Sequence, residues 1–551
     1  METREATFTS WDGEKLFYRA WLPAGGAKRA VLLFHRGHEH SGRFASFVNE
    51  LALEGVAFFA WDARGNGMSP GPRDDVEHFG VYAKDADCFA RHVASEHGID
   101  TANTAVVASS VGALVAATWV HDYAPPIRAQ VLAAPAFRIK LYVPLAIPLL
   151  RLAMKLGVME RVQSYVKSRV LTHDPQERQR LDDDPLITHS ISTRVLVDAH
   201  DTATRLLRDA GAIRVPTLVL TAGSDWVVST RPQRRFLDGL GTEEKRQVTL
   251  PGSYHAIFFE RDRERALRVT REFLTLHFAG EPARPPLVHA DLGSRSRQVH
   301  DRLAAGRRSL SGAVSRLFLK TVGRLSDGIA LGWKSGFDSG VTLDYVYRNE
   351  PRGATPLGRF IDRQYLNSPG WSGIRQRRRN LERLLRRAID LVRKNGASVH
   401  IVDVAAGPGR YILETLRDLN DASITALLRD YQEVNLDAGR RLASELGLDG
   451  AVRYEAGDAF SKDELSNLSP RPALAIVSGL FELFPENAGP RATLSGLAAA
   501  MEPGSCLLYT NQPWHPQLEF IARVLTNREG RPWIMRSRSS VPWRSRTAWR
   551  S

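Results

Sequence analysis

The sequence contains little cysteine and no long uninterrupted apolar run. Its two cysteines, Cys88 and Cys506, fall in different halves, which disfavours a disulfide framework and favours a reducing cytoplasm. Residues 1–5 are polar, so no secretory signal is expected there. The most apolar stretch, residues 141–159, is interrupted by two prolines, an arginine and a lysine. We therefore expect a buried or interfacial helix there and not a membrane span.

Acidic residues are outnumbered by basic ones, and the formal net charge is +14. Residues 531–551 contain six arginines and no acid, so +8 remains for the other 530 residues. The remaining basic runs, at 302–324 and 375–379, lie on segments with helical apolar spacing and lack the series of interleaved aromatic residues that a single-strand stacking platform requires. We interpret them as solvated faces of amphipathic helices, with anionic lipid as the alternative partner and nucleic acid as the least favoured one. The apolar faces consist of Leu310, Val314, Leu317, Val322 and Leu325, and of Leu381, Leu384, Leu385, Ala388 and Val392.

The length and the order of predicted elements indicate an α/β chain with more than one domain. Its 551 residues exceed a single core, and strand and helix patterns alternate up to residue 278. Prolines at 281–286 and a polar tract after them then indicate a linker. The predicted divisions are a first domain over 1–280 with a cap at about 136–205, a linker over 281–300, a helical lead-in over 301–398, a second domain over 399–530 and an aberrant basic tail over 531–551.

Three polar residues lie just after predicted strands. Ser110 follows an apolar run and is flanked by small residues, as the sharp strand-to-helix turn of a nucleophile requires. Asp225 follows the apolar run 217–220, and His255 lies just past a strand that includes 248–250. Nucleophile, acid and base in this order along the chain is the order found in α/β hydrolases. We therefore predict that these three residues form a catalytic triad.

Two further motifs make this prediction more specific. Residues 35–44 read His-Arg-Gly-His-Glu-His-Ser-Gly-Arg-Phe, and residues 62–69 read Asp-Ala-Arg-Gly-Asn-Gly-Met-Ser. With the turn around Ser110, residues 7–278 resemble the monoacylglycerol lipase and lysophospholipase branch of the α/β hydrolases, also called serine-aminopeptidase-like. The resemblance implies an α/β-hydrolase fold with a helical cap.

The resemblance also assigns roles to individual residues. Ser110 would be the nucleophile, His255 the general base and Asp225 the group that orients the imidazole. The backbone N–H groups of Gly37 and Val111 would form the oxyanion hole.

The chain departs from the family pattern near this hole. Arg36 and His38 stand where the family usually has glycines, and Ala108 replaces the first glycine of the serine motif. Ala108 is small enough to keep the turn possible. Arg36 would either narrow the pocket or recruit an anionic head group.

The predicted cap suits an apolar substrate. Residues 146–156 are rich in leucine, isoleucine and alanine, enough to cover an acyl chain. By resemblance, the substrate is a medium or long acyl ester such as a monoacylglycerol or a lysophospholipid. The acidic run 182–184 is interpreted as a solvated turn, so no metal site is predicted.

A second glycine-rich turn follows the strand predicted at 399–404. Residues 402–410 read Val-Asp-Val-Ala-Ala-Gly-Pro-Gly-Arg, and glycines there let a ligand approach the backbone. The next strand ends at Asp430, about twenty residues further on, where an acid that holds ribose hydroxyls belongs. Another strand, at 452–456, leads to Asp458.

These features resemble the class I S-adenosyl-L-methionine-dependent methyltransferases over residues 399–527. The resemblance implies a Rossmann-like domain with S-adenosyl-L-methionine as its cofactor. The implied contacts are Asp403, Ala405, Gly407 and Gly409 near the methionine moiety, Asp430 at the ribose, and Asp458 with Ala459 at the adenine. The Asn/Asp-Pro-Pro-Tyr motif that acts on the amino groups of bases is absent after the fourth strand, which further disfavours nucleic acid.

From end to end, the chain resembles a bacterial family of bifunctional α/β hydrolase and class I methyltransferase fusions. Residues 336–349 belong to this resemblance, and their aromatic and polar mix suits either a pocket wall or surface packing. Residues 531–551 show no alternating apolar pattern. We expect this copy to be truncated relative to its family, with the edge of the fifth strand unpaired.

The leading hypothesis is therefore a cytoplasmic lipid-ester hydrolase fused to a methyltransferase. One alternative makes methyl transfer the main activity and the hydrolase half an accessory. A third, non-enzymatic hypothesis is a scaffold that binds lipid surfaces through its basic helices.

Overall fold

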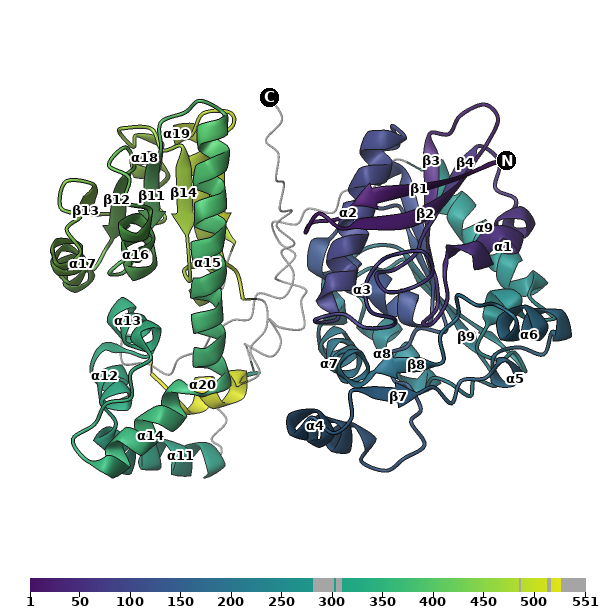
Figure 1. Cartoon of the computed structure of the whole chain (residues 1–551), viewed down its shortest axis with the longest axis horizontal. Helices are drawn as coiled ribbons and strands as arrows, with labels where there is room; N and C mark the ends of the chain where they lie inside the picture. Colours follow the sequence, from purple (N-terminus) through teal and green to yellow (C-terminus); the bar gives the residue numbers. More distant parts are fainter. Residues whose placement is uncertain (281–301, 304–309, 485–486, 513–516, 527–551) are drawn as a thin grey trace. The chain divides into compact units, whose positions relative to one another are not determined.

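The computed structural model describes residues 1–280, 302–303, 310–484, 487–512 and 517–526. Contacts between residues divide the described chain into two compact units, a first unit within 1–280 and a second unit within 302–526 (Figure 1). The predicted linker at 281–300 and the predicted basic tail at 531–551 lie outside the described residues.

An eight-stranded sheet forms the centre of the first unit. Its strands are β1 (Glu2–Thr9), β2 (Lys15–Leu22), β3 (Arg29–Phe34), β4 (Val56–Trp61), β5 (Thr104–Ser109), β6 (Gln130–Ala133), β9 (Thr217–Ala222) and β10 (Lys245–Leu250). The order is β1-β2-β4-β3-β5-β6-β9-β10. β2 runs antiparallel to β1 and β4, and the other neighbours are parallel. β4, β5 and β9 are buried along their whole length, as parallel strands between two helical layers must be.

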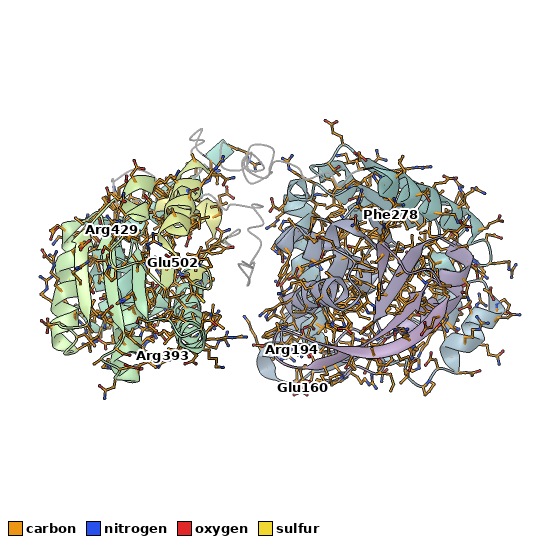
Figure 2. All side chains as sticks on the ribbon, turned by 90° about the horizontal axis from the view of Figure 1, so that it is seen from above. Glu160, Arg194, Phe278, Arg393, Arg429 and Glu502 are labelled. Carbon is orange, nitrogen blue, oxygen red and sulfur yellow. The ribbon has the colours of Figure 1, made fainter. Side chains whose placement is uncertain are left out.

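Helices cover both faces of this sheet (Figure 1). They are α1 (Ala45–Leu51), α2 (Gly80–Glu96), α3 (Val111–Tyr123), α7 (Thr193–Asp209), α8 (Thr230–Gly239) and α9 (Glu264–Ala279). α2, α3, α7 and α8 share one apolar core with the sheet, which includes Trp119 and Phe236. α1 and α9 share the other, which includes Phe47 and Phe278; Figure 2 labels the latter. The fold is that of an α/β hydrolase.

The segment between β6 and β9 lies where the cap was predicted. Before α7 it contains α4 (Ala146–Leu156), β7 (Arg161–Gln163), α5 (Ser168–Leu171), α6 (Pro175–Asp182) and β8 (Ser190–Ser192). β7 and β8 pair antiparallel. Unlike α7, α4 buries none of its residues.

A parallel five-stranded sheet forms the centre of the second unit. Its strands are β11 (His400–Val404), β12 (Thr425–Asp430), β13 (Val452–Ala456), β14 (Leu474–Val477) and β15 (Cys506–Tyr509). The order β13-β12-β11-β14-β15 changes direction between β11 and β14. In open α/β sheets, ligands bind at this switch point, beside the carboxyl ends of the strands.

Helices again lie on both faces of the sheet. α15 (Pro369–Lys394), α16 (Arg410–Leu419) and α17 (Glu433–Glu445) pack on one face, and α18 (Lys462–Ser466) with α19 (Ala488–Ala500) on the other. A separate helical group consists of α11 (Leu310–Lys320), α12 (Asp327–Ser335), α13 (Gly340–Arg348), α14 (Pro356–Leu366) and α20 (Leu518–Val524). The long α15 runs along both this group and the sheet (Figure 1).

The two predicted amphipathic faces differ in the structure. In α15, Leu381 and Leu385 are buried. In α11, by contrast, Leu310 is 90% exposed and Leu317 is 65% exposed, so the apolar face of this helix is largely open to solvent. None of the helices within the described ranges combines the length and apolar character that crossing a membrane requires.

Candidate active sites

Ser110 occupies a strained turn between β5 and α3. Its φ of 53° and ψ of −116° lie outside the regions that L-residues normally adopt. The turn also requires small neighbours, because a Cβ on Gly112 would come within 2.2 Å of the carbonyl oxygen of His35. The strained turn places the Ser110 side chain above the carboxyl end of the sheet, where the loops that follow β9 and β10 also begin.

The structure brings the three predicted triad residues together, although they are distant in the sequence. His255 Nε2 lies 2.8 Å from Ser110 Oγ, and His255 Nδ1 lies 2.9 Å from Asp225 Oδ2. All three residues are buried. The backbone N–H groups of Val227 and Val228 donate to Asp225 Oδ1 at 2.7 and 2.8 Å, which fixes the carboxylate in place.

The environment keeps Asp225 ionised. Burial raises the pKa of Asp225, but the neighbouring His255 and the donated N–H bonds together lower it further, so the pKa lies below its ordinary value. A carboxylate in this state accepts a hydrogen bond from Nδ1 of His255 and leaves Nε2 free to take a proton from Ser110.

The predicted oxyanion residues also adjoin one another. A Cβ on Gly37 would lie 3.1 Å from Cγ2 of Val111, so the turn after β3 closely approaches the first residue of α3. Their backbone N–H groups therefore lie in the same region as Ser110.

The structure argues against the second alternative for Arg36, the recruitment of an anionic head group. The side chain is 4% exposed and forms a two-pronged ion pair with Glu39, whose carboxylate it meets through Nε at 2.9 Å and through Nη2. Burial raises the pKa of Glu39, but Arg36 lowers it more, to about 2. Because this cation is already neutralised, it is not available to recruit a head group. His38 adopts a left-handed backbone conformation (φ 68°), which glycine adopts more readily, and this explains why the family usually has glycine at this position.

A cavity of about 730 Å³ opens at the switch point of the second sheet. It is bounded by the loops that follow β11, β12, β13 and β14, and by parts of α13 and α15. Of the predicted cofactor residues, those that line it are Ala405, Gly407, Gly409, Asp430, Asp458 and Ala459.

The glycine-rich turn is shaped for close approach. Gly409 has φ +73°, and a Cβ there would come within 2.0 Å of the Leu428 side chain. The N–H of Gly407 donates to Asp430 Oδ2 at 2.9 Å, and Asn435 Nδ2 donates to Asp430 Oδ1 at 3.0 Å. These bonds hold the acid at the end of β12 against the turn.

Asp403 is the predicted cofactor residue that does not line the cavity. Its side chain is buried inside the unit, 2.6 Å from the hydroxyl of Tyr411. Burial raises the pKa of Asp403 to about 8. It therefore supports the turn from behind instead of facing a ligand.

Part of the cavity wall comes from the helical lead-in, whose residues were not predicted to bind a ligand individually. Tyr347 on α13 and Arg377 on α15 line it. Arg377 pairs with the buried Glu482 at 2.5 Å and lies against Gly479, where a Cβ would come within 2.9 Å of the guanidinium. The one sequence signal was the mixed aromatic and polar segment 336–349.

These features fit a nucleotide-bearing cofactor. The turn has no room for a Cβ at Gly409, a carboxylate stands at the end of β12, and a second carboxylate, Asp458, follows β13. Such carboxylates accept hydrogen bonds from ribose hydroxyls and from an adenine amino group.

Comparison with known families assigns both units. Residues 25–262 match a family described as "Serine aminopeptidase, S33", and residues 270–542 match one described as "Putative methyltransferase". The chain is therefore a fusion of an α/β hydrolase of lipase type and a methyltransferase domain.

Individual proteins are similar to this chain over its whole length or over about half of it. The uncharacterized protein YnbC of Escherichia coli is 46% identical over 544 residues, which cover 97% of this chain and 92% of that protein. A monoacylglycerol lipase of Mycolicibacterium smegmatis is 23% identical over 278 residues, covering 50% of this chain and 97% of the lipase. Among solved structures, a monoacylglycerol lipase of Paleococcus ferrophilus has a TM-score of 0.42 and 23% identity, covering 50% of this chain and all of that one.

Proposed function

The chain belongs to the same family as YnbC of Escherichia coli, and we propose that it combines a serine esterase acting on lipid-like esters with an S-adenosyl-L-methionine-dependent methyltransferase. The main observation that supports esterase activity is the hydrogen-bonded series Asp225–His255–Ser110, in which the serine lies on a strained turn.

In the proposed reaction, Ser110 Oγ attacks the ester carbonyl carbon while His255 Nε2 takes its proton. The N–H groups of Gly37 and Val111 stabilise the charge that develops on the carbonyl oxygen, each donor contributing roughly 10²–10³ in rate. His255 then gives the proton to the leaving alcohol, and water releases the acyl group by the same steps. Asp225 holds the imidazole in the required tautomer.

The proposed substrate is a medium or long acyl ester of the monoacylglycerol or lysophospholipid type. The apolar cap and the similarity to monoacylglycerol lipases support this class.

A fluorophosphonate probe tests the esterase directly. Intact mass should show a single adduct on the wild-type chain and none on Ser110→Ala. An unmodified wild type would mean that the triad is inactive, and methyl transfer would then become the main activity. A labelled wild type justifies a screen of acyl chain length.

The methyltransferase activity is proposed from the cavity of the second unit. Bound S-adenosyl-L-methionine would supply an electrophilic methyl group. Asp430 would hold its ribose, Asp458 and Ala459 would meet its adenine, and the turn containing Gly407 and Gly409 would lie along the methionine moiety.

Calorimetric titration of the full chain with S-adenosyl-L-methionine checks this assignment. Asp430→Ala should weaken binding by at least about tenfold, which corresponds to the loss of one charge-assisted hydrogen bond. Asp437→Ala, an exposed acid on α17 that lies outside the cavity lining, is the matched control. Equal affinity in both variants would refute the role of Asp430.

A specific observation also favours peripheral contact with a membrane surface. Leu149, Leu152 and Leu156 of α4, together with Leu145 just before the helix, follow helical spacing and are 53–74% exposed. A cytoplasmic enzyme that takes its substrate from a bilayer would bury such a stripe in the interface, with Lys155 beside anionic head groups.

Co-sedimentation with anionic liposomes measures this contact. The double variant Leu149→Glu/Leu152→Glu should lose binding, whereas Leu276→Glu, at a single exposed leucine on α9, should retain it. Unchanged sedimentation of the α4 variant would exclude this helix as the contact.

A further inference from the structure

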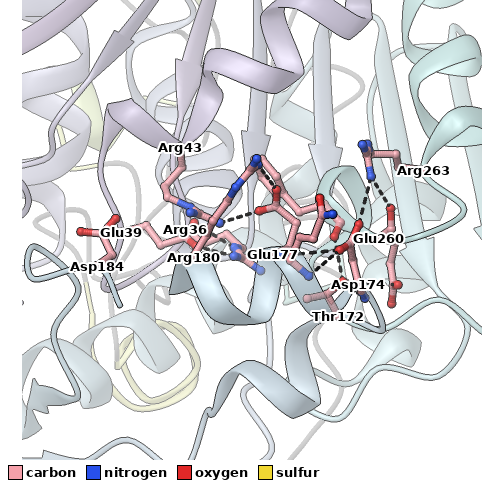
Figure 3. A network of polar contacts seen from close by, with 12 residues as sticks. Arg36, Glu39, Arg43, Thr172, Asp174, Glu177, Arg180, Asp184, Glu260 and Arg263 are labelled. Carbon is pink, nitrogen blue, oxygen red and sulfur yellow. Dashed lines mark hydrogen bonds and ion pairs between the residues drawn. The ribbon is translucent and has the colours of Figure 1, made fainter. Parts of the chain in front are cut away.

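One segment of the cap reaches the loop that carries His255. We call this segment, residues 171–188, the cap brace. The carboxylate of Glu260, only 2% exposed, accepts the N–H of Tyr254 at 2.7 Å and the N–H of His173 at 3.0 Å. A single buried side chain thus links the residue before His255 to the brace, and Figure 3 shows Glu260 beside the brace residues Thr172 and Asp174.

The same brace reaches the oxyanion turn, residues 35–43, through charged side chains. Arg43 Nη2 lies 2.7 Å from Glu177 Oε2, and both side chains are more than nine-tenths buried (Figure 3). His40 Nε2 lies 2.8 Å from Asp184 Oδ2. Because Nδ1 of His40 accepts the N–H of Gly42, Nε2 is the nitrogen that donates to Asp184.

A third link ends next to Gly37. His38 Nδ1 lies 2.8 Å from Asp74 Oδ2, and Thr188 of the brace donates to the same carboxylate oxygen. These bonds hold a residue with left-handed backbone in a position where glycine would be the ordinary choice.

The two loops also meet each other directly. The guanidinium groups of Arg36 and Arg43 each lie 5.7 Å from the ring centroid of Phe259, which follows the His255 loop. The N–H of Ala256 donates to the carbonyl of Leu171 in the brace at 2.8 Å. Brace, oxyanion turn and His255 loop therefore form one continuous polar network.

We propose that the cap brace is a positioning element for ester hydrolysis, with Glu177 and Asp184 setting the oxyanion turn against the His255 loop. The inference rests on the proposed esterase. Neither residue is in the triad or forms the oxyanion hole, so each acts through the turn. Displacing reacting groups by about 1 Å can cost roughly a hundredfold in rate, and a buried charge left without its partner moves its neighbours.

The test compares Glu177→Gln and Asp184→Asn with Asp201→Asn in the full chain. Asp201 pairs with Arg151 elsewhere in the cap, and both side chains are about half exposed. With a soluble short-chain p-nitrophenyl ester, we expect kcat to fall between about tenfold and a hundredfold in the two brace variants, with KM little changed. Asp201→Asn should match the wild type.

A second readout separates positioning from partial unfolding. The N–H donors of an oxyanion hole are positioned to bind a negatively charged oxygen. The wild type should therefore hydrolyse an oxygen ester faster than the corresponding thionoester, in which sulfur replaces the carbonyl oxygen. A misplaced turn lowers this preference, whereas a fraction of unfolded protein lowers both rates equally. The charge-reversed pair Arg43→Glu/Glu177→Arg should recover part of the preference.

Two results would overturn the inference. Brace variants with the kcat and thionoester discrimination of the control would show that the brace does not position the turn. If Glu177→Gln fails to fold, Asp184→Asn alone decides, because its side chain is partly exposed. A wild type that neither labels at Ser110 nor turns over would instead refute the esterase itself, and the positioning role with it.

Discussion

At Ser110 the backbone adopts a conformation that costs an L-residue roughly 1–3 kcal/mol, and the surrounding structure maintains it. Gly112 leaves space for the carbonyl of His35, and the buried Ala108 has a side chain small enough to fit beside the turn. The strain leaves the hydroxyl projecting towards His255. Residue identity therefore matters most in this turn and in the groups that orient the imidazole.

Replacing Asp225 with Asn tests the orienting role. Asn retains an oxygen for the N–H groups of Val227 and Val228, but its amide would face Nδ1 of His255 with a donor. The imidazole would then favour the wrong tautomer, and kcat for ester hydrolysis should fall by about 10⁴, as in other serine hydrolase triads.

The measurement is steady-state turnover of a p-nitrophenyl ester, with far-UV circular dichroism to verify the fold. Asp201→Asn serves as the control because its carboxylate is exposed. Less than a tenfold loss in Asp225→Asn would argue against this triad.

Asp403 makes the stability of the second unit depend on pH. Its pKa is about 8 in the folded state, against 3.8 for an unperturbed aspartate, so the folded state holds an extra proton between these values. Stability should therefore fall as pH rises from about 4 to 8, by up to about 1.4 kcal/mol per pH unit, and then level off.

Asp403→Asn should flatten this slope and stabilise the second unit at pH 8. Differential scanning calorimetry of the full chain from pH 5 to pH 9 measures it, with the exposed Asp437→Asn as control. A slope equal to that of the wild type would mean that Asp403 is ionised in the folded protein.

At the scale of elements, the glycine turn after β11 is the most sensitive to substitution. Gly409→Ala places a Cβ within 2.0 Å of Leu428 and forces a left-handed backbone. The backbone alone costs roughly 1–2 kcal/mol, and the displaced turn should weaken S-adenosyl-L-methionine binding by more than about tenfold.

Gly447→Ala is the matched control, because Gly447 has φ +69° and a Cβ added there would meet nothing within 4 Å. It should lose stability by a similar backbone amount and keep its affinity in calorimetric titration. Equal loss of affinity in both variants would contradict a local role for the Gly409 turn.

Sequence patterns predicted elements well where burial is two-sided. The strand predicted at 399–404 corresponds to β11, and the apolar run 217–220 lies within β9, because buried parallel strands are continuous and apolar. The sequence patterns predicted less about which part of the protein covers the apolar face of a helix. Leu310 and Leu385 belong to similar amphipathic patterns, yet one is exposed and the other buried, since helical spacing defines a face without defining its neighbour.

The same limit applies to site residues. Asp225 and His255 each follow a strand of a parallel sheet, and strand ends meet at one edge, so their association could be anticipated. Asp403 lies within β11, where neighbouring side chains alternate between faces, and its contact with Tyr411 depends on packing. Tyr347 and Arg377 reach the cavity from helices outside the sheet, through tertiary contacts that periodicity does not encode.

At the scale of the whole molecule, the two units have separate cores and separate sites. We therefore expect two calorimetric transitions. S-adenosyl-L-methionine at about a hundred times its Kd should stabilise one of them by about 2.7 kcal/mol and leave the other in place.

Labelling Ser110 with fluorophosphonate should not move the transition that responds to S-adenosyl-L-methionine. A single cooperative transition, or a shift of both by one ligand, would indicate energetic coupling between the units. Ester hydrolysis by a chain ending at Gly280 would further show that the first unit acts alone.

The long sequence separation within the triad has a kinetic consequence. The Ser110–His255 contact joins residues 145 positions apart, and the strands that carry them, β5 and β10, are separated in the sheet by β6 and β9. Such non-local contacts form late in folding, because loop closure costs entropy before the contact is made. Nascent chains would therefore be unreactive towards esters until the sheet is assembled, and the appearance of nucleophilicity would mark the end of refolding.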